Sequence, residues 1–326
     1  MLVKPRVYLT RRLPAVVMDR LTEETDLAFN PEDRSATKCE IIAGLHGRDA
    51  LLCNIADQID AAILEACPGL KVVANFGVGF NTIDVAAATR KGIPVTNTPR
   101  VLTEATADLA FLLLLAVARR LGEGERLVRA RQWTGWAPLQ LLGADVAGAT
   151  LGIVGCGRIG RAVARRARAF DMRIVYWNRT RLPADVEAGE GIEYASLESL
   201  LQRADFVSLH VAYGPATHHL LGAPQLALMK SSALLINTAR GAVVDERALV
   251  QALHNKRLAG AGLDVFENEP AVSPGLLQME NVILSPHLGS ATIGTRTRMG
   301  MMAVDNLLAA CAGRRPPHCV NPEVLG

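Results

Sequence analysis

One short segment in the middle of the chain, Gly155-Cys-Gly-Arg-Ile-Gly160, constrains the fold more than any other. A Gly-x-Gly-x-x-Gly pattern by itself arises often by chance, so the residues around it decide its meaning. Here the apolar segment 150–154 precedes it with the character of a strand, and a helical pattern follows over 161–170. This strand–turn–helix context predicts a βαβ unit that binds a dinucleotide.

The three glycines of this turn suit three different physical requirements. Gly155 permits a tight turn, Gly157 lets the backbone approach a pyrophosphate, and Gly160 lets helix and strand pack closely. The backbone amides of Arg158 and Ile159 would then face the phosphates at the positive end of the helix. We therefore expect all five residues to contact the cofactor.

The residues after the next predicted strand, 173–177, bear on which dinucleotide is bound. An acidic residue there would accept hydrogen bonds from a ribose 2′-hydroxyl and repel a 2′-phosphate. The chain has Asn178, Arg179, Thr180 and Arg181 instead, with two guanidinium groups and a hydroxyl. This predicts that NADP(H) is preferred, with NAD(H) also possible. The alternative is that these arginines are only surface residues.

The rest of the chain alternates short apolar runs with longer helical patterns, which is typical of an α/β fold with parallel sheets. Further strands are expected at 6–10, 50–53, 71–74, 93–96, 205–209, 233–237, 260–264 and 282–285. Helices are expected at 59–67, 103–118, 197–203, 246–254 and about 292–312, and Gly122 is expected to act as a stop after the long apolar helix.

Composition excludes several classes of protein. The 326 residues carry a formal net charge of only +3 with scattered basic residues, so a nucleic-acid partner is not expected. The most apolar run, 107–118, is too short to span a bilayer, and no secretory pattern is seen near the N-terminus. The six cysteines include no Cys-x-x-Cys pair, so neither a metal site nor a disulfide framework is predicted. We expect a cytoplasmic protein with free thiols.

Three residues stand directly after predicted strands: Arg240, Glu269 and His287. Since the carboxyl ends of strands face the ligand crevice in open α/β sheets, the three could converge. Arginine can hold a carboxylate through two parallel hydrogen bonds, and histidine can donate a proton near neutral pH. A carboxylate beside the histidine would orient its ring and favour its protonated form. The alternatives are a structural histidine and a plain surface ion pair.

These segments together resemble the D-isomer-specific 2-hydroxyacid dehydrogenases, and most closely the glyoxylate/hydroxypyruvate reductase branch. The resemblance covers nearly the whole chain. Its motifs occur in the family's order at 75–84, 102–108, 155–160, 237–241, 262–270 and 286–292.

The resemblance implies two doubly wound domains with an active-site cleft between them. A flavodoxin-like, substrate-binding domain would comprise 1–101 and 291–326, and a Rossmann cofactor domain would be inserted at 102–290. Members of the family form homodimers, and the polar stretch at about 122–147, which contains Trp133 and Trp136, resembles their dimerisation arm. Trp136 could reach the neighbouring active site or only pack in the interface.

The same resemblance implies site roles. Arg240 would bind the substrate carboxylate and polarise its carbonyl, His287 would donate the proton, and Glu269 would be its partner. The backbone amides of Val78 and Gly79 would complete the carboxylate cradle. Ser290 and Trp136 are further candidates for substrate contact. Besides the glycine-rich turn and residues 178–180, the cofactor would be lined by Thr106, Val211, Pro215, Thr217, Thr238, Ala239, Arg240, Asp264, His287 and Gly289.

The implied activity is NADPH-dependent reduction of glyoxylate or hydroxypyruvate to glycolate or D-glycerate. Two alternatives remain: a dehydrogenase for another D-2-hydroxy acid, and a dinucleotide-gated binding module like the corepressors that share the fold. One segment departs from the family, which often has Pro-Leu-Thr-Pro-Glu-Thr where this chain has Val211-Ala-Tyr-Gly-Pro-Ala-Thr217. Tyr213 and Gly214 could reshape the pocket for the 2′-phosphate.

Overall fold

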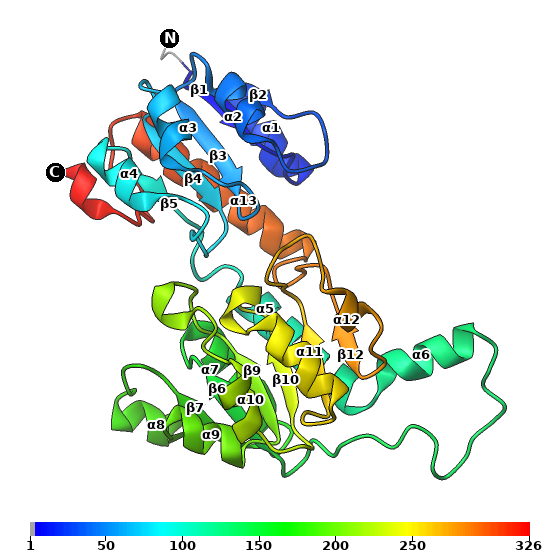
Figure 1. Ribbon diagram of the computed structural model, residues 1–326. Helices are drawn as coiled ribbons and strands as arrows, with labels where there is room; N and C mark the ends of the chain where they lie inside the picture. The colour runs from blue at the N-terminus through cyan, green and yellow to red at the C-terminus, as the bar shows by residue number, and fades with distance from the viewer. Residues whose placement is uncertain (1–3) are drawn as a thin grey trace. The chain divides into compact units, whose positions relative to one another are not determined.

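The computed structural model describes residues 4–326 and divides into two compact units (Figure 1). One unit is formed by the chain up to Leu102 together with Ala291–Gly326, and the other is the continuous segment Thr103–Ser290. Each unit is an α/β structure built on its own parallel sheet.

The first unit has a five-stranded parallel sheet in the order β2-β1-β3-β4-β5, which is the flavodoxin-like order. Its strands are β1 (Arg6–Leu9), β2 (Asp26–Phe29), β3 (Ala50–Asn54), β4 (Val72–Phe76) and β5 (Val95–Thr96). Its helices are α1 (Ala15–Glu24), α2 (Lys38–Leu45), α3 (Ala61–Ala66), α4 (Val85–Arg90) and α13 (Ile293–Cys311).

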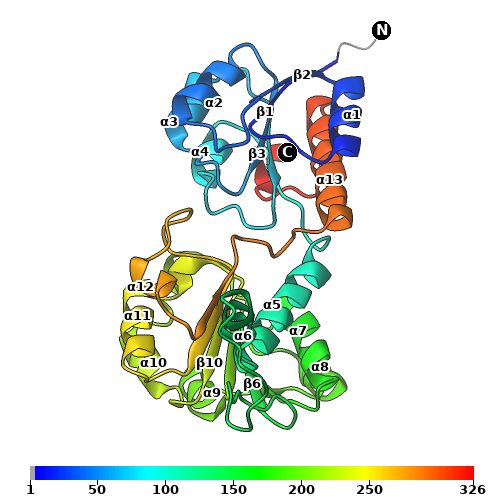
Figure 2. The same ribbon diagram turned by 90° about the vertical axis from the view of Figure 1, so that its right-hand side faces the viewer.

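Helices cover both faces of this sheet, with α1 and α13 on one side and α2, α3 and α4 on the other (Figure 2). The alternation of side chains along β3 produces the two cores. Leu51 and Cys53 pack in the core under α2, α3 and α4, whereas Leu52 packs in the core under α1 and α13. Both faces of β3 are therefore apolar, as expected for a central parallel strand.

The second unit has a seven-stranded parallel sheet in the order β12-β11-β10-β9-β6-β7-β8. Its strands are β6 (Thr150–Val154), β7 (Arg173–Trp177), β8 (Glu193–Tyr194), β9 (Phe206–Leu209), β10 (Leu234–Asn237), β11 (Gly260–Leu263) and β12 (Val282–Leu284). Its helices are α5 (Thr103–Ala118), α6 (Leu121–Arg129), α7 (Arg158–Arg168), α8 (Ala184–Glu190), α9 (Leu197–Arg203), α10 (Ala223–Leu228), α11 (Glu246–His254) and α12 (Pro274–Leu277).

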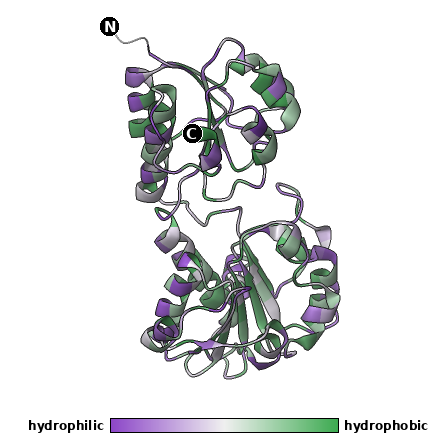
Figure 3. Ribbon diagram, turned by 90° about the vertical axis from the view of Figure 1, so that its left-hand side faces the viewer, coloured by the Kyte–Doolittle hydropathy of each residue, from purple (hydrophilic) through white to green (hydrophobic). Residues whose placement is uncertain are grey.

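Taken from β8, the order β8-β7-β6-β9-β10-β11 is the strand order of the Rossmann fold. The direction of winding changes between β6 and β9, which is the topological switch point. Helices α5 and α7 cover one face, and α9, α10, α11 and α12 cover the other. The strands of this sheet are mostly green in the hydropathy colouring of Figure 3, because their side chains are buried on both sides. The predicted α/β class with two doubly wound parallel sheets is confirmed.

The strands and helices predicted from the sequence all form, with ends that shift by a few residues. The expectation that Gly122 stops the long helix was wrong. The chain turns instead at Arg120, whose φ of 51° is left-handed, and Gly122 lies inside α6. The stretch after α5 therefore begins as a helix, although none of the residues of α6 is buried. Among residues 4–326, none of the helices has the length and apolar character needed to cross a membrane.

Candidate active site

Three neighbouring strands of the second sheet, β10, β11 and β12, end at the same edge and are followed by three loops. These loops carry Arg240, Glu269 and His287. The loops of Arg240 and Glu269 pack directly together, because a Cβ atom on Gly241 would lie only 1.8 Å from the carbonyl carbon of Phe266. Only glycine fits at position 241, so this close approach is built into the backbone.

His287 and Glu269 form a hydrogen-bonded pair. The distance from His287 Nδ1 to Glu269 Oε2 is 2.8 Å, and Glu269 Oε1 accepts from the backbone amide of Phe266 at 3.1 Å. Burial of Glu269 works against its charge, but the hydrogen bond and charge of His287 outweigh it and hold the pKa of Glu269 below its usual value. Because Nδ1 is engaged, the ring has Nε2 left to offer to another molecule.

The turn that presents His287 is organised by Asp264, which is 1% exposed. Asp264 Oδ1 accepts from the Ser285 hydroxyl at 2.6 Å and from the Leu288 amide at 2.7 Å, and Oδ2 accepts from the Gly289 amide at 2.9 Å. The carbonyl of Asp264 accepts from the amide of His287 at 2.9 Å. These bonds hold His287 at a φ of 53°, a conformation that costs energy for a non-glycine residue.

Thr106, in the first turns of α5, attaches that helix to the same turn. Its hydroxyl donates to the carbonyl of Gly289 at 3.1 Å. Thr106 and Gly289, both predicted to line the cofactor, are thus brought together.

The turn that carries Arg240 is held by the last residue of β10. Asn237 donates from Nδ2 to the carbonyl of Arg240 at 2.9 Å and accepts from the amide of Ala239 at 3.0 Å. Arg240 Nη1 donates to the carbonyl of Ala239 at 2.8 Å. Burial lowers the pKa of the Arg240 guanidinium, and the negative charge of Glu269 works against this.

The glycine-rich turn has the geometry that a pyrophosphate requires. Gly155 has a φ of +98°, and a Cβ atom on it would meet the amide nitrogen of Val211 at 2.6 Å. A Cβ on Gly160 would lie 2.4 Å from the carbonyl oxygen of Gly155. Gly157 differs from both, because a Cβ there would have no neighbour within 4 Å. The fold itself does not require glycine at 157, whereas a ligand approaching the backbone would.

Two further observations fit a bound dinucleotide at this edge of the sheet. The hydroxyl of Thr238 is buried yet has no hydrogen-bond partner within residues 4–326, so it is available to a ligand. The first amides of α7, those of Arg158 and Ile159, have no acceptor within their own helix and lie at its positive end. The residues present therefore fit a dinucleotide phosphate group.

The polar side chains of the segment after β7 differ in their partners. Asn178 Oδ1 accepts from the amide of Cys156 in the glycine-rich turn at 2.6 Å. Arg179 is exposed and forms no ion pair within residues 4–326, and Thr180 beside it is also exposed. Arg181 is instead held by Glu187 through Nε and Nη2, at 2.8 and 2.7 Å. Of the two arginines noted in the sequence, Arg179 is therefore the one without a carboxylate partner among the described residues.

The loop after β9 contacts the glycine-rich turn through Val211, as the Gly155 geometry shows. Thr217 folds back on this loop, accepting from the amide of Gly214 at 2.9 Å and donating to the carbonyl of Ala212 at 2.8 Å. Pro215 is the first residue of a short 3₁₀ helix in this loop, Pro215–Thr217, and is exposed.

Val78 and Gly79 lie in the first unit, on the loop after β4. Their carbonyls accept from Asn97 Nδ2 at 2.9 Å and Asn75 Nδ2 at 2.8 Å, respectively. Within residues 4–326 no acceptor is found for the amides of Val78 and Gly79. The loop thus offers two backbone donors. Ser290 is the last residue of the second unit. Trp136 lies on the segment after α6 and is 82% exposed.

The residues that fix the site's shape were harder to find in the sequence than those that face a ligand. Asn237, Gly241 and Ser285 were not singled out, although each holds a loop in place. The available signal was a polar residue or glycine at the carboxyl end of each strand, but such residues are common in loops.

With this geometry described, comparison with known proteins shows the family. Residues 111–289 match the model of the D-isomer specific 2-hydroxyacid dehydrogenase, NAD binding domain. The chain belongs to this family of oxidoreductases. The family predicted from the sequence motifs is therefore confirmed, as is a nicotinamide dinucleotide as the class of cofactor that the second unit binds.

Individual relatives span the full length of the chain. The glyoxylate reductase of Korarchaeum cryptofilum is 49% identical, with 99% of this chain and 98% of that protein aligned. The glyoxylate reductase of Thermococcus litoralis is 46% identical over the same shares. Among solved structures, the NADPH-dependent glyoxylate/hydroxypyruvate reductase of Sinorhizobium meliloti in complex with NADP and malonate is 36% identical, with 97% of each chain covered and a TM-score of 0.87.

Proposed function

We propose that this protein reduces a small 2-oxo acid, with glyoxylate the first candidate, and that it prefers NADPH to NADH. The observation that carries the proposal is the His287–Glu269 pair, set beside the Arg240 loop and at the same sheet edge as the glycine-rich turn. The glyoxylate reductases at 46–49% identity over nearly the full chain support the choice of substrate.

The side chains suit the parts of this reaction that a protein must supply. Arg240 would bind the substrate carboxylate through its planar fork and draw electron density from the neighbouring carbonyl. His287 would give the proton on Nε2 to the carbonyl oxygen, since Nδ1 is bonded to Glu269. Glu269 would keep the ring oriented and favour its protonated form. The bound nicotinamide would supply the hydride.

The geometry of the second unit supports the choice of cofactor residues. Gly157 and the amides of Arg158 and Ile159 would hold the pyrophosphate, and the orphan hydroxyl of Thr238 would bond the cofactor. Further contacts are proposed for the neighbouring loop residues Thr106, Gly155, Gly160, Val211, Pro215, Thr217, Ala239, Asp264 and Gly289.

NADPH is favoured over NADH because the segment after β7 has no acidic residue facing outward. Asn178 is tied to the glycine-rich turn, and Arg179 and Thr180 follow it on the surface. A guanidinium and a hydroxyl at this place would bind a 2′-phosphate. The NADP-bound structure of the Sinorhizobium meliloti relative gives a precedent within the family.

The first unit would contribute to substrate binding through the amides of Val78 and Gly79. We also propose a homodimer formed through the arm at about 122–147. Its support is the run of exposed apolar side chains there, since a soluble monomer rarely leaves so many uncovered. They are Val128, Trp133, Trp136, Leu139 and Leu142.

A steady-state panel tests the proposal. Glyoxylate, hydroxypyruvate and pyruvate are each supplied with NADPH and with NADH, and oxidation of the reduced nicotinamide is followed. We expect the highest kcat/KM with glyoxylate or hydroxypyruvate and NADPH. Tight binding of the dinucleotide without turnover of any 2-oxo acid would refute the proposal and favour a binding module.

A further inference from the structure

The loop that follows β7 is fastened at one point by a single buried carboxylate. Glu187, in α8, accepts from Tyr176 Oη at 2.5 Å and from both Nε and Nη2 of Arg181. Tyr176 Oη in turn accepts from the amide of Leu182 at 2.9 Å. Glu187 therefore joins β7, α8 and Arg181, and Tyr176 connects the next loop residue, Leu182, to the same cluster.

This carboxylate remains charged at every working pH. Its side chain is 11% exposed, and its bonds to Arg181 and Tyr176 lower the pKa of Glu187 to about 2. Burial raises the pKa of Tyr176 to about 12, and its hydrogen bond to Glu187 acts in the same direction. Near neutral pH the hydroxyl of Tyr176 is therefore the donor and the carboxylate of Glu187 the acceptor.

These contacts hold Arg181 on α8 and β8. Its guanidinium lies over the ring of Tyr194 in β8, 5.3 Å from the ring centroid, as well as on Glu187. Asn178, three residues earlier, is bonded to the glycine-rich turn. The loop is therefore bonded to the glycine-rich turn at one end, through Asn178, and held by α8 and β8 at the other, through Arg181.

We propose that Glu187 is a positioning residue for recognition of the cofactor's 2′-phosphate. By holding Arg181, it fixes the loop so that Arg179 and Thr180 are presented to the phosphate. The inference rests on the proposed preference for NADPH. Arg181 then has a structural role. Glu187, which lies outside both the glycine-rich turn and the loop, contributes to the selectivity for NADPH over NADH.

The charges favour this assignment over a direct role for Arg181. An unpaired carboxylate near the phosphate would repel it, but the two-pronged bond to Arg181 neutralises Glu187. The phosphate would then meet the charge of Arg179. Fixing the loop before binding also lowers the ordering cost that would otherwise weaken affinity.

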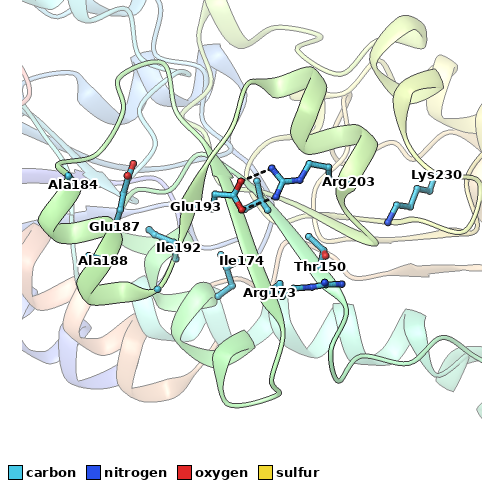
Figure 4. Close-up of a pocket in the computed structure, with 12 residues that line it drawn as sticks. Thr150, Arg173, Ile174, Ala184, Glu187, Ala188, Ile192, Glu193, Arg203 and Lys230 are labelled. Atoms are coloured by element: carbon cyan, nitrogen blue, oxygen red, sulfur yellow. Dashed lines mark hydrogen bonds and ion pairs between the residues drawn. The ribbon is translucent and has the colours of Figure 1, made fainter.

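The chain offers a matched control. Glu187 lies on α8, in the wall of a cavity of about 830 Å³ that is also lined by Glu193 and Arg203. Figure 4 shows it beside Ala184 and Ala188. Glu193 and Arg203 form a two-pronged pair at 2.7 and 2.8 Å, of the same kind as Glu187 and Arg181. The control pair joins β8 to the end of α9, and within residues 4–326 the hydrogen bonds of its two side chains do not involve the loop after β7.

The test measures affinity by calorimetry for two adenosine probes, adenosine 2′,5′-bisphosphate and adenosine 5′-monophosphate. We expect Glu187→Gln to weaken the bisphosphate about ten-fold while changing the monophosphate less than about two-fold. Arg181→Met should show the same selective loss, and the double variant should be no worse than either single variant. Glu193→Gln should change neither affinity. The KM for NADPH should rise in the Glu187 variant without a change in kcat.

Three results would overturn the inference. Equal weakening of both probes would mean that Glu187 only stabilises the unit. Tighter binding of the bisphosphate by Glu187→Gln would mean that Arg181 is a phosphate ligand held back by the carboxylate. Unchanged affinities would remove Glu187 from recognition altogether. If Glu187→Gln does not fold, Arg181→Met on the exposed guanidinium carries the same test.

The probes lack the reacting end of the cofactor, so the result does not depend on the 2-oxo acid. Failure of glyoxylate turnover would leave the inference intact. A wild-type protein that binds both probes equally would overturn the proposed NADPH preference and the inference with it. If the wild type prefers the bisphosphate and Glu187→Gln keeps that preference, the inference is overturned but the proposed NADPH preference stands.

Discussion

His287 occupies a left-handed backbone conformation, and the residues around it explain how that is sustained. Asp264 accepts four hydrogen bonds in all, three through its carboxylate and one through its carbonyl, from the turn 285–289. The ring is then bonded at Nδ1 to Glu269. The imidazole is therefore fixed in both backbone and side chain, as a proton donor requires.

Glu269→Gln tests the electrostatic part of this pair. The hydrogen bond and charge of His287 hold the pKa of Glu269 below its usual value, so an ionised carboxylate lies 2.8 Å from the ring. Reduction needs the protonated ring, so activity falls as pH rises past the point where the ring loses its proton. Without the negative neighbour this occurs at lower pH. We expect the alkaline limb of the kcat/KM profile for reduction to move to lower pH by about one unit.

The control for this experiment is Glu267→Gln. Glu267 lies on the same loop as Glu269 and bonds another histidine, His219, at 2.8 Å. Within residues 4–326 it has no hydrogen bond or ion pair with His287. Its profile should keep the wild-type alkaline limb. A Glu269→Gln profile that coincides with that of the wild type would show that the carboxylate does not support proton transfer.

At the scale of elements, the turn between β6 and α7 contains one glycine that the packing of the fold requires and one that only a bound ligand would require. A methyl group on Gly160 would collide with the carbonyl of Gly155, whereas one on Gly157 would meet nothing within 4 Å. The first is a packing requirement between strand and helix. The second is open space at the positive end of α7.

The matched pair Gly157→Ala and Gly160→Ala tests this separation. We expect Gly157→Ala to fold with a Tm close to that of the wild type and to lose dinucleotide affinity by at least ten-fold, because its methyl group fills the space for the pyrophosphate. Gly160→Ala should lower the Tm markedly, since overpacking typically costs about 1–3 kcal/mol. Thermal melts and dinucleotide titrations check both. Wild-type affinity in Gly157→Ala would place the phosphates elsewhere.

The elements also show how far sequence reasoning reaches. The long helix α5, the two Rossmann strands β6 and β7, and the helices α9 and α11 are strongly patterned, and the sequence predicted them. The edge strands β2 and β8 were not predicted, since they are short and their side chains mostly lie near the surface. The helices α1 and α2 were also missed, since only two residues of each are buried.

The site was predictable to a similar degree, and for a similar reason. Arg240, Glu269 and His287 could be found because reactive side chains follow strands in a recognisable order. The pairing of Arg181 with Glu187 could not, because it depends on how α8 packs on β7. The turn at Arg120, rather than at Gly122, likewise depends on the following residues forming α6.

At the scale of the whole molecule, the arm is the largest concentration of uncovered apolar side chains on a single segment. Trp136 and Leu139 are 82% and 80% exposed. Burying such residues against a partner releases about 25 cal/mol for each Å² of apolar area, which favours association. This is why we propose that the arm forms the homodimer.

The double variant Trp136→Ser/Leu139→Ser tests that proposal. We expect it to shift from dimer to monomer in analytical ultracentrifugation while the fold, followed by circular dichroism, stays intact. Phe170→Ser, an exposed aromatic outside the arm, serves as the control and should remain a dimer. A wild-type protein that sediments as a monomer, or a double variant that still dimerises, would contradict the role of the arm.

The most direct test of the central claim compares the wild type with His287→Asn, since asparagine tolerates the left-handed conformation found at this position. NADPH oxidation on mixing with glyoxylate is measured alongside NADPH affinity for each protein. The account predicts that the wild type forms glycolate, and that the variant binds NADPH equally well but turns over about 10²–10⁴-fold more slowly. A variant with wild-type turnover, or one that has lost the cofactor as well, would contradict it.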